Sequence, residues 1–124
     1  PEDFASGLFT NEFYADVYNA LTEDGIMMNQ TENPFLDEWN IKKIYRNMQE
    51  SFPIVQSFSA PMSIYPGVFW TFGFCSKKYH ATDFNPQKIF EMQSLERSLK
   101  WYNMDWHRGA FSLSNFHKNK IGLY

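Results

Sequence analysis

Hydrophobic positions along the chain alternate between two spacings, which predict helices and strands in turn. After Thr10, apolar residues recur three or four positions apart, which predicts a helix that Gly25 ends with a left-handed C-cap. A third helix is predicted after Asn85 and Pro86, an N-cap followed by a first-turn proline. Between them, Asp37 is the expected N-cap of a second helix. The apolar face of that second helix comprises Trp39, Ile41, Ile44, Tyr45 and Met48.

Three apolar runs too short for helices predict strands at residues 26–29, 54–60 and 68–77. The first is expected to be buried and to end in polar residues. A tight turn at Pro66-Gly67 joins the last two, so they should pair antiparallel, whereas the helix between the first two indicates a parallel crossover. Residues 1–9 are expected to be irregular, and we assign no regular element to residues 100–124.

This order predicts an α/β fold, the C-terminal half of a Rossmann-like sheet of the S-adenosylmethionine-dependent methyltransferase type, ending in an antiparallel strand pair. Three strands are too few for such a sheet, and no glycine-rich nucleotide loop is present. We therefore expect residues 1–124 to be one half of a catalytic domain. The aromatic content of 19% also favours a partner, because an isolated half-sheet would expose an apolar edge and face.

Composition narrows the function classes. The formal net charge of −3 argues mildly against nucleic acid and against anionic membranes. A lone cysteine, Cys75, excludes a disulfide framework and a cysteine-cluster metal site, and its apolar surroundings indicate a buried, inert thiol. There is no signal peptide and no membrane-spanning apolar stretch, so we expect a cytoplasmic protein.

Several short motifs appear in a fixed order along the chain. They are Leu8-Phe9, Gln30-Thr31-Glu32, Phe52-Pro53, Tyr65-Pro66-Gly67, Phe72-Gly73-Phe74, Ser76-Lys77 and Tyr102-Asn103. Each is weak alone, but in this order and spacing the chain resembles the C-terminal half of the polyamine aminopropyltransferases, the spermidine synthase family. The resemblance covers essentially the whole chain.

The resemblance implies transfer of the aminopropyl group of decarboxylated S-adenosylmethionine, a co-substrate, to putrescine. The products are spermidine and methylthioadenosine, and no metal or other cofactor is implied. The attacking amine must be neutral, yet an alkylamine resembles lysine, with a pKa of about 10.4, so a positioned carboxylate is needed to take its proton. In the family this carboxylate belongs to an Asp-Ser-Ser/Thr-Asp-Pro motif, whose proline matches Pro1.

The aspartates of that motif and the nucleotide loop would then lie in an N-terminal half that this chain does not include. We expect that half as a separate polypeptide. The labile Asp-Pro bond at this boundary favours cleavage as its origin, and a genetic separation is the alternative. The chain would be catalytic only when complemented by it, and the family implies a homodimer of the reassembled enzyme.

The resemblance assigns amine-side roles to three residues. Gln30 would bind an amine of the polyamine, although it could simply face water at a strand end. Tyr65 would lie beside the attacking amine as a catalytic and substrate-binding residue, the alternative being a core tyrosine at a turn. Glu32 would share one side of the extended segment with Gln30 and shape an acidic pocket, or only solvate the strand end. Trp70 is more typical of a core residue than of a pocket wall.

Pro1, Phe4 and Ala5 fall where the family lines the nucleoside. Asp3-Phe4 replaces the family's Gly-Pro, and Val68 replaces a small or polar residue. These departures either change which amine is accepted or are neutral.

Three other interpretations remain. His80, His107 and His117 lack carboxylates at ligand spacing, which favours surface or hydrogen-bonded histidines over a metal site. A methyltransferase would share the sheet topology but does not explain Gln30 and Tyr65. A non-catalytic binding or assembly module would keep the scaffold without the aspartates.

Overall fold

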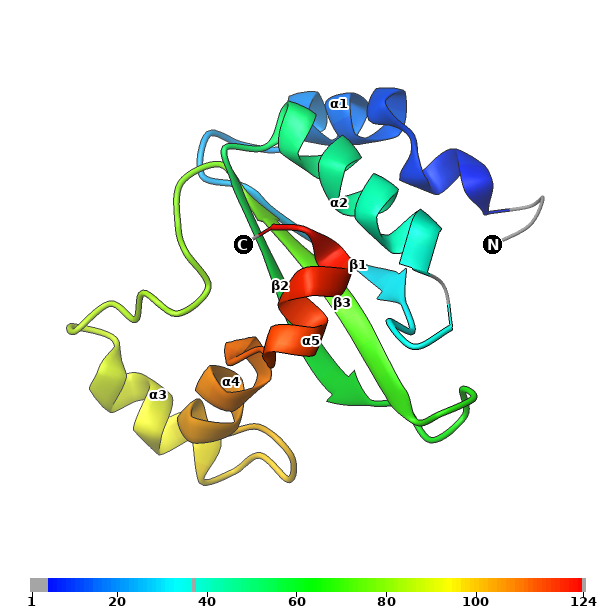
Figure 1. Ribbon diagram of the computed structural model, residues 1–124. Coiled ribbons are helices and arrows are strands. Elements are labelled where there is room, and N and C mark those ends of the chain that lie inside the picture. Colours follow the sequence, from blue (N-terminus) through cyan, green and yellow to red (C-terminus); the bar gives the residue numbers. More distant parts are fainter. Residues whose placement is uncertain (1–4, 37, 124) are drawn as a thin grey trace.

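The computed structural model describes residues 5–36 and 38–123, excluding the side chains of residues 38 and 39. Its centre is a sheet of β1 (Ile26–Glu32), β2 (Ile54–Pro61) and β3 (Phe69–Ser76) in the order β1-β3-β2. Both neighbouring pairs are antiparallel, so β1 and β2 run in the same direction with β3 inserted between them (Figure 1). The predicted crossover and hairpin are therefore both present.

One face of the sheet is covered by α1 (Asn11–Ala20), α2 (Glu38–Ser51) and α5 (Asn115–Ile121). The core between them and the sheet is formed by Tyr14, Ile41, Ile44, Tyr45, Met48, Phe52, Cys75 and Ile121. The predicted apolar face of α2 is confirmed at four positions, while Asp37 and the side chain of Trp39 lie outside the described residues. Burial raises the pKa of the Cys75 thiol to about 12, as expected for an inert core cysteine.

On the opposite face, α4 (Met104–Phe111) packs on β2, and α3 (Ile89–Glu96) packs on α4. Phe111 of α4 packs on Phe58 of β2 and Phe74 of β3, with ring centroids 4.9 and 5.9 Å apart. Neither α4 nor α5 was predicted, although each has a sequence signal. Asn103 and Ser114 cap these helices by accepting from the backbone N–H three residues later.

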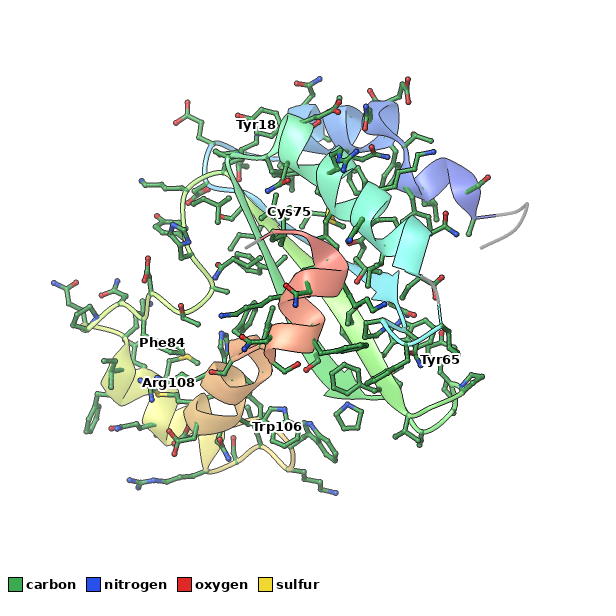
Figure 2. The ribbon with its side chains drawn as sticks, in the orientation of Figure 1. Tyr18, Tyr65, Cys75, Phe84, Trp106 and Arg108 are labelled. Carbon is green, nitrogen blue, oxygen red and sulfur yellow. The ribbon has the colours of Figure 1, made fainter. Side chains whose placement is uncertain are left out.

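His107 connects the C-terminal segment, residues 100–123, to the loop after β3 through hydrogen bonds. Its ring contacts the Tyr102 hydroxyl at 3.0 Å and the Ala81 carbonyl at 2.8 Å. Arg108 lies over the ring of Phe84, 4.8 Å from its centroid (Figure 2). The histidine therefore has a structural, hydrogen-bonded role.

Several local predictions are wrong. The first helix ends at Ala20, and Gly25 has no left-handed conformation. Gly25 is needed instead for close approach, because a Cβ there would lie 2.6 Å from the Leu21 Cβ. The strand expected to be buried at 26–29 extends to Glu32 and leaves Ile26 and Met28 43% and 62% exposed.

Other boundaries also differ. A short 3-10 helix, η1 (Ser6–Phe9), occupies part of the region expected to be irregular. Asn85 caps a turn by accepting from the Gln87 N–H, and α3 begins only at Ile89. Lys77 is half-buried and donates to the Leu21 carbonyl at 2.9 Å.

Candidate active site

The first component of the site is a bulge near the end of β1. Gln30 pairs with Phe72 of β3, whereas Glu32 pairs with Thr71, so Thr31 is an extra residue. The Thr31 hydroxyl lies 3.0 Å from the Tyr45 hydroxyl and 2.7 Å from the Thr71 hydroxyl. The bulge removes the regular alternation on which the shared side of Gln30 and Glu32 was predicted. The shared side of these two residues stays a prediction.

The side chain of Thr31, the bulge residue, belongs to a set of buried, hydrogen-bonded polar side chains that we call the hydroxyl network. Its members are Thr71, Thr31, Tyr45, Ser57 and His117, each at most 1% exposed. Ser57 lies 2.6 Å from the Tyr45 hydroxyl and 3.0 Å from Nε2 of His117, and Tyr45 also donates to the Phe72 carbonyl at 3.1 Å. The network therefore joins all three strands to α2 and α5, and it holds the bulge in place.

Burial shifts the acid–base properties of this network. It raises the pKa of Tyr45 and lowers the pKa of His117 to about 4, since the charged form of each is poorly solvated there. Both side chains are therefore neutral near pH 7. A neutral, fully hydrogen-bonded network at this depth is typical of a structural element rather than of a proton donor or acceptor.

The second component is the turn between β2 and β3, which carries Tyr65. Its ring is half-buried against Trp70, with centroids 4.2 Å apart. Gly67 and Val68 have φ angles of +79° and +60°, in the left-handed region. This conformation is ordinary for glycine but strained for a β-branched residue, by about 1–3 kcal/mol. Figure 2 shows Tyr65 at the hairpin end of the sheet, away from Tyr18, which is a residue of α1.

Strand register and a ring contact together place Gln30 and Tyr65 at one end of one sheet face. Gln30 is opposite Phe72, and Trp70 follows on the same face of β3 because side chains alternate along a strand. Tyr65 stacks on that Trp70. The end of β1 adjoins the start of β3, since the two strands are antiparallel. Gln30 is exposed and Tyr65 half-buried, so both side chains are accessible in this chain.

The remaining predicted site residues are less informative. Glu32 is half-buried just after the bulge. Ala5 precedes η1, and its carbonyl accepts from the Leu8 N–H at 3.0 Å. Pro1 and Phe4 lie outside the described residues.

Sequence reasoning missed a cavity beside the hairpin. It has a volume of about 710 Å³ and lies between α4 and the ends of β2 and β3. Its lining includes Pro61, Val68, Phe69, Asp105 and Trp106. The signal for it was in the tail, where Asn103 starts a helix that places Trp106 beside the hairpin (Figure 2).

In the described ranges, no three histidine, cysteine or carboxylate side chains are grouped so as to bind a metal ion. None of the helices found in those ranges is long and apolar enough to cross a membrane.

The architecture matches solved structures of methyltransferase-like α/β fold. One is spermidine synthase from Thermotoga maritima, with a TM-score of 0.84 and 38% identity over 98% of this chain and 41% of that one. Another is spermidine synthase in complex with the transition-state analogue AdoDATO, with a TM-score of 0.83, 39% identity, and coverage of 96% and 41%.

Sequence comparison gives the same result. The profile described as "Spermine/spermidine synthase domain" matches residues 1–86. Polyamine aminopropyltransferases from Clostridium perfringens (strain SM101 / Type A) and Lachnoclostridium phytofermentans are 39% and 41% identical, over 93% and 97% of this chain. The chain belongs to the spermine/spermidine synthase family. It spans 40% and 42% of the length of these two relatives.

Proposed function

We propose that the chain forms the amine-binding part of a polyamine aminopropyltransferase that makes spermidine from putrescine and decarboxylated S-adenosylmethionine. The observation that carries the proposal is the shared position of Gln30 and Tyr65. Gln30 in β1 and Tyr65 in the turn between β2 and β3, 35 positions apart by their numbers, lie on one face at one end of the sheet. A ligand with two amines can contact a side-chain amide and a phenol placed in this way.

Each side chain has a defined role toward a diamine. The Gln30 amide oxygen accepts a hydrogen bond from the distant ammonium without adding a fixed charge. The Tyr65 hydroxyl accepts from the attacking amine and donates to a carboxylate of the N-terminal half, which holds the nitrogen in line with the methylene carbon. A C–N bond then forms as the C–S bond of the sulfonium breaks. Methylthioadenosine leaves, and the amine proton passes to the carboxylate.

The N-terminal half is the proposed partner, and the first strand offers a surface for it. β1 is at the edge of the sheet formed by the described strands, and its Ile26 and Met28 are 43% and 62% exposed. An exposed edge with apolar side chains is a template for pairing with a further strand. We infer that the half carrying the aspartates docks here. Ala5, with Pro1 and Phe4, would line the nucleoside, and the reassembled enzyme would be a homodimer.

A product assay tests the proposal. The chain together with the aspartate-bearing half is incubated with putrescine and either decarboxylated or intact S-adenosylmethionine. Spermidine and methylthioadenosine should form only with the decarboxylated compound. Methyl transfer from the intact compound would establish the methyltransferase instead, and a stable complex with no turnover would establish the assembly module.

The role of Gln30 is tested in the same assay. Gln30→Ala should raise the KM for putrescine about tenfold, the cost of one hydrogen bond to a charged group, and leave the KM for the sulfonium substrate unchanged. Gln87→Ala, at an exposed glutamine outside the site, is the matched control. Equal KM values for putrescine in the two variants would remove Gln30 from the amine site.

A further inference from the structure

We propose that Asn33 is a positioning residue that fixes the Tyr65 turn to the end of β1. The inference rests on the proposed function, because it concerns the alignment of Tyr65 with Gln30. Asn33 follows β1 directly and is 1% exposed. Asn33 is not a member of the hydroxyl network, and its hydrogen bonds are independent of that network.

Both the nitrogen and the oxygen of the Asn33 side-chain amide form hydrogen bonds. Its Nδ2 donates to the Pro66 carbonyl at 2.9 Å, and its Oδ1 accepts from the Phe35 N–H at 2.9 Å. The first bond spans 33 residues of sequence and reaches the residue that follows Tyr65. The second holds the loop after β1 in an Asx turn. Because an amide has both a donor and an acceptor, one side chain orders both loops.

The turn is shaped around this contact. A Cβ on Gly67 would lie 2.9 Å from Nδ2 of Asn33, so a larger residue there would displace the amide. The φ angle of +79° at Gly67 also favours glycine. The close approach of the Asn33 amide to the turn backbone thus depends on a residue without a side chain.

The turn has backbone hydrogen bonds of its own, from the Met62 N–H to the Val68 carbonyl at 2.7 Å and from the Val68 N–H to the Tyr65 carbonyl at 3.2 Å, and Asn33 adds a contact from outside it. Ile64 and Val68 are 79% and 51% exposed, so the apolar side chains of the turn contribute little packing. Val68 is in the strained left-handed region, which persists only where surrounding structure holds it. The hydrogen bond from the buried Asn33 side chain to the Pro66 carbonyl supplies such an anchor, next to the contact between the Tyr65 and Trp70 rings.

The consequence concerns catalytic geometry. Tyr65 and Gln30 sit on separate segments, and the Asn33 bond ties the Tyr65 turn to the segment that follows Gln30. A displacement of about 1 Å at a reacting group lowers turnover by up to roughly a hundredfold. Loss of the tether should therefore affect the amine half-site and leave binding of the sulfonium substrate intact.

The experiment compares three variants in the enzyme that contains this chain and the aspartate-bearing half. Asn33→Ala removes both hydrogen bonds. Asn33→Asp keeps an acceptor for Phe35 but places a carboxylate oxygen against the Pro66 carbonyl, so it breaks only the tether. Asn85→Ala is the control, because Asn85 is exposed and caps only its own turn. Amide hydrogen exchange of residues 62–68 is measured beside the kinetics.

Both Asn33 variants should lower kcat about tenfold and raise the KM for putrescine, with the KM for decarboxylated S-adenosylmethionine unchanged. Exchange at 62–68 should accelerate in both, while exchange in β3 and all properties of Asn85→Ala stay near wild type. Wild-type kinetics in Asn33→Asp would overturn the proposal, since Asn33 would then order only its own loop. If the wild-type enzyme transfers no aminopropyl group, the proposed function fails, and unchanged exchange at 62–68 would overturn the tether separately.

Discussion

The two faces of the same three strands satisfy their polar groups in different ways. On the face toward α2, the Thr31 and Thr71 hydroxyls are hydrogen-bonded within the hydroxyl network and shielded from solvent. On the opposite face, Gln30 is exposed, and Nε1 of Trp70 is buried with no hydrogen-bond partner among the described residues. Residues adjacent in sequence, 30 and 31 or 70 and 71, thus lie on opposite faces of the sheet.

Residues that we expect to determine stability and residues with a proposed role in function are therefore neighbours along the same strands. Because side chains alternate along a strand, each pair of neighbours contributes one side chain to the hydroxyl network and one to the open face. Substitutions in the network should mainly change the free energy of unfolding. Substitutions on the open face should mainly change turnover. The predictions below test that separation, beginning with the largest effect.

The first prediction concerns His117 and pH. Its pKa is lowered to about 4 in the folded protein and is about 6.5 in the unfolded chain, so between these values the unfolded state binds more protons. The stability contributed by neutral His117 is complete above about pH 6.5 and is lost as pH falls toward 4, by up to about 3 kcal/mol. Urea denaturation over this range measures the loss.

A matched pair of variants isolates that effect from other titrating groups. His117→Gln keeps a polar partner for Ser57 but cannot gain the proton, so its stability should depend less on pH than that of the wild type. His80→Gln removes an exposed histidine and should retain the wild-type dependence. If all three proteins showed the same dependence, His117 would not contribute to acid sensitivity.

The second prediction concerns the centre of the network. Tyr45→Phe removes the hydroxyl shared by Thr31, Ser57 and the Phe72 carbonyl, leaving these groups buried without that partner. The free energy of unfolding should fall by about 2 kcal/mol, measured by urea denaturation. Tyr79→Phe, at an exposed tyrosine, should change it by less than about 0.5 kcal/mol. Turnover per folded molecule should stay near wild type, and a large loss there would show that the two faces are not separable.

The sequence predicted the strands and central helix well because their signals are local. The apolar face of α2 and the Pro66-Gly67 turn follow from periodicity and from residue types that permit particular backbone angles. Gln30 and Tyr65 were selected through motifs, and the register of Gln30 with the contact of Tyr65 on Trp70 places them on one face. Their roles remain predictions.

Other features depend on long-range contacts that no window of sequence contains. The Thr31 bulge is held by Tyr45 and Thr71, 14 and 40 residues away. Asn33 looked like one polar residue in a polar run, and only its bond to Pro66 distinguishes it. Val68 in the left-handed region contradicts its local preference, so tertiary structure overrides propensity there.

The third prediction concerns the open face. Tyr65→Phe removes the hydroxyl proposed to contact the attacking amine but retains the ring stacked on Trp70 at 4.2 Å. We expect kcat to fall about tenfold, or about 1.4 kcal/mol in activation free energy, since proton handling at the amine is lost. The free energy of unfolding should change by less than about 0.5 kcal/mol, because the half-buried hydroxyl is not part of the hydroxyl network. Steady-state kinetics with putrescine and urea denaturation of the same preparation measure both quantities, with Tyr79→Phe as the control. A variant with wild-type kcat would exclude Tyr65 from the chemistry, whereas a variant that lost stability instead would assign it to the structural side of the sheet.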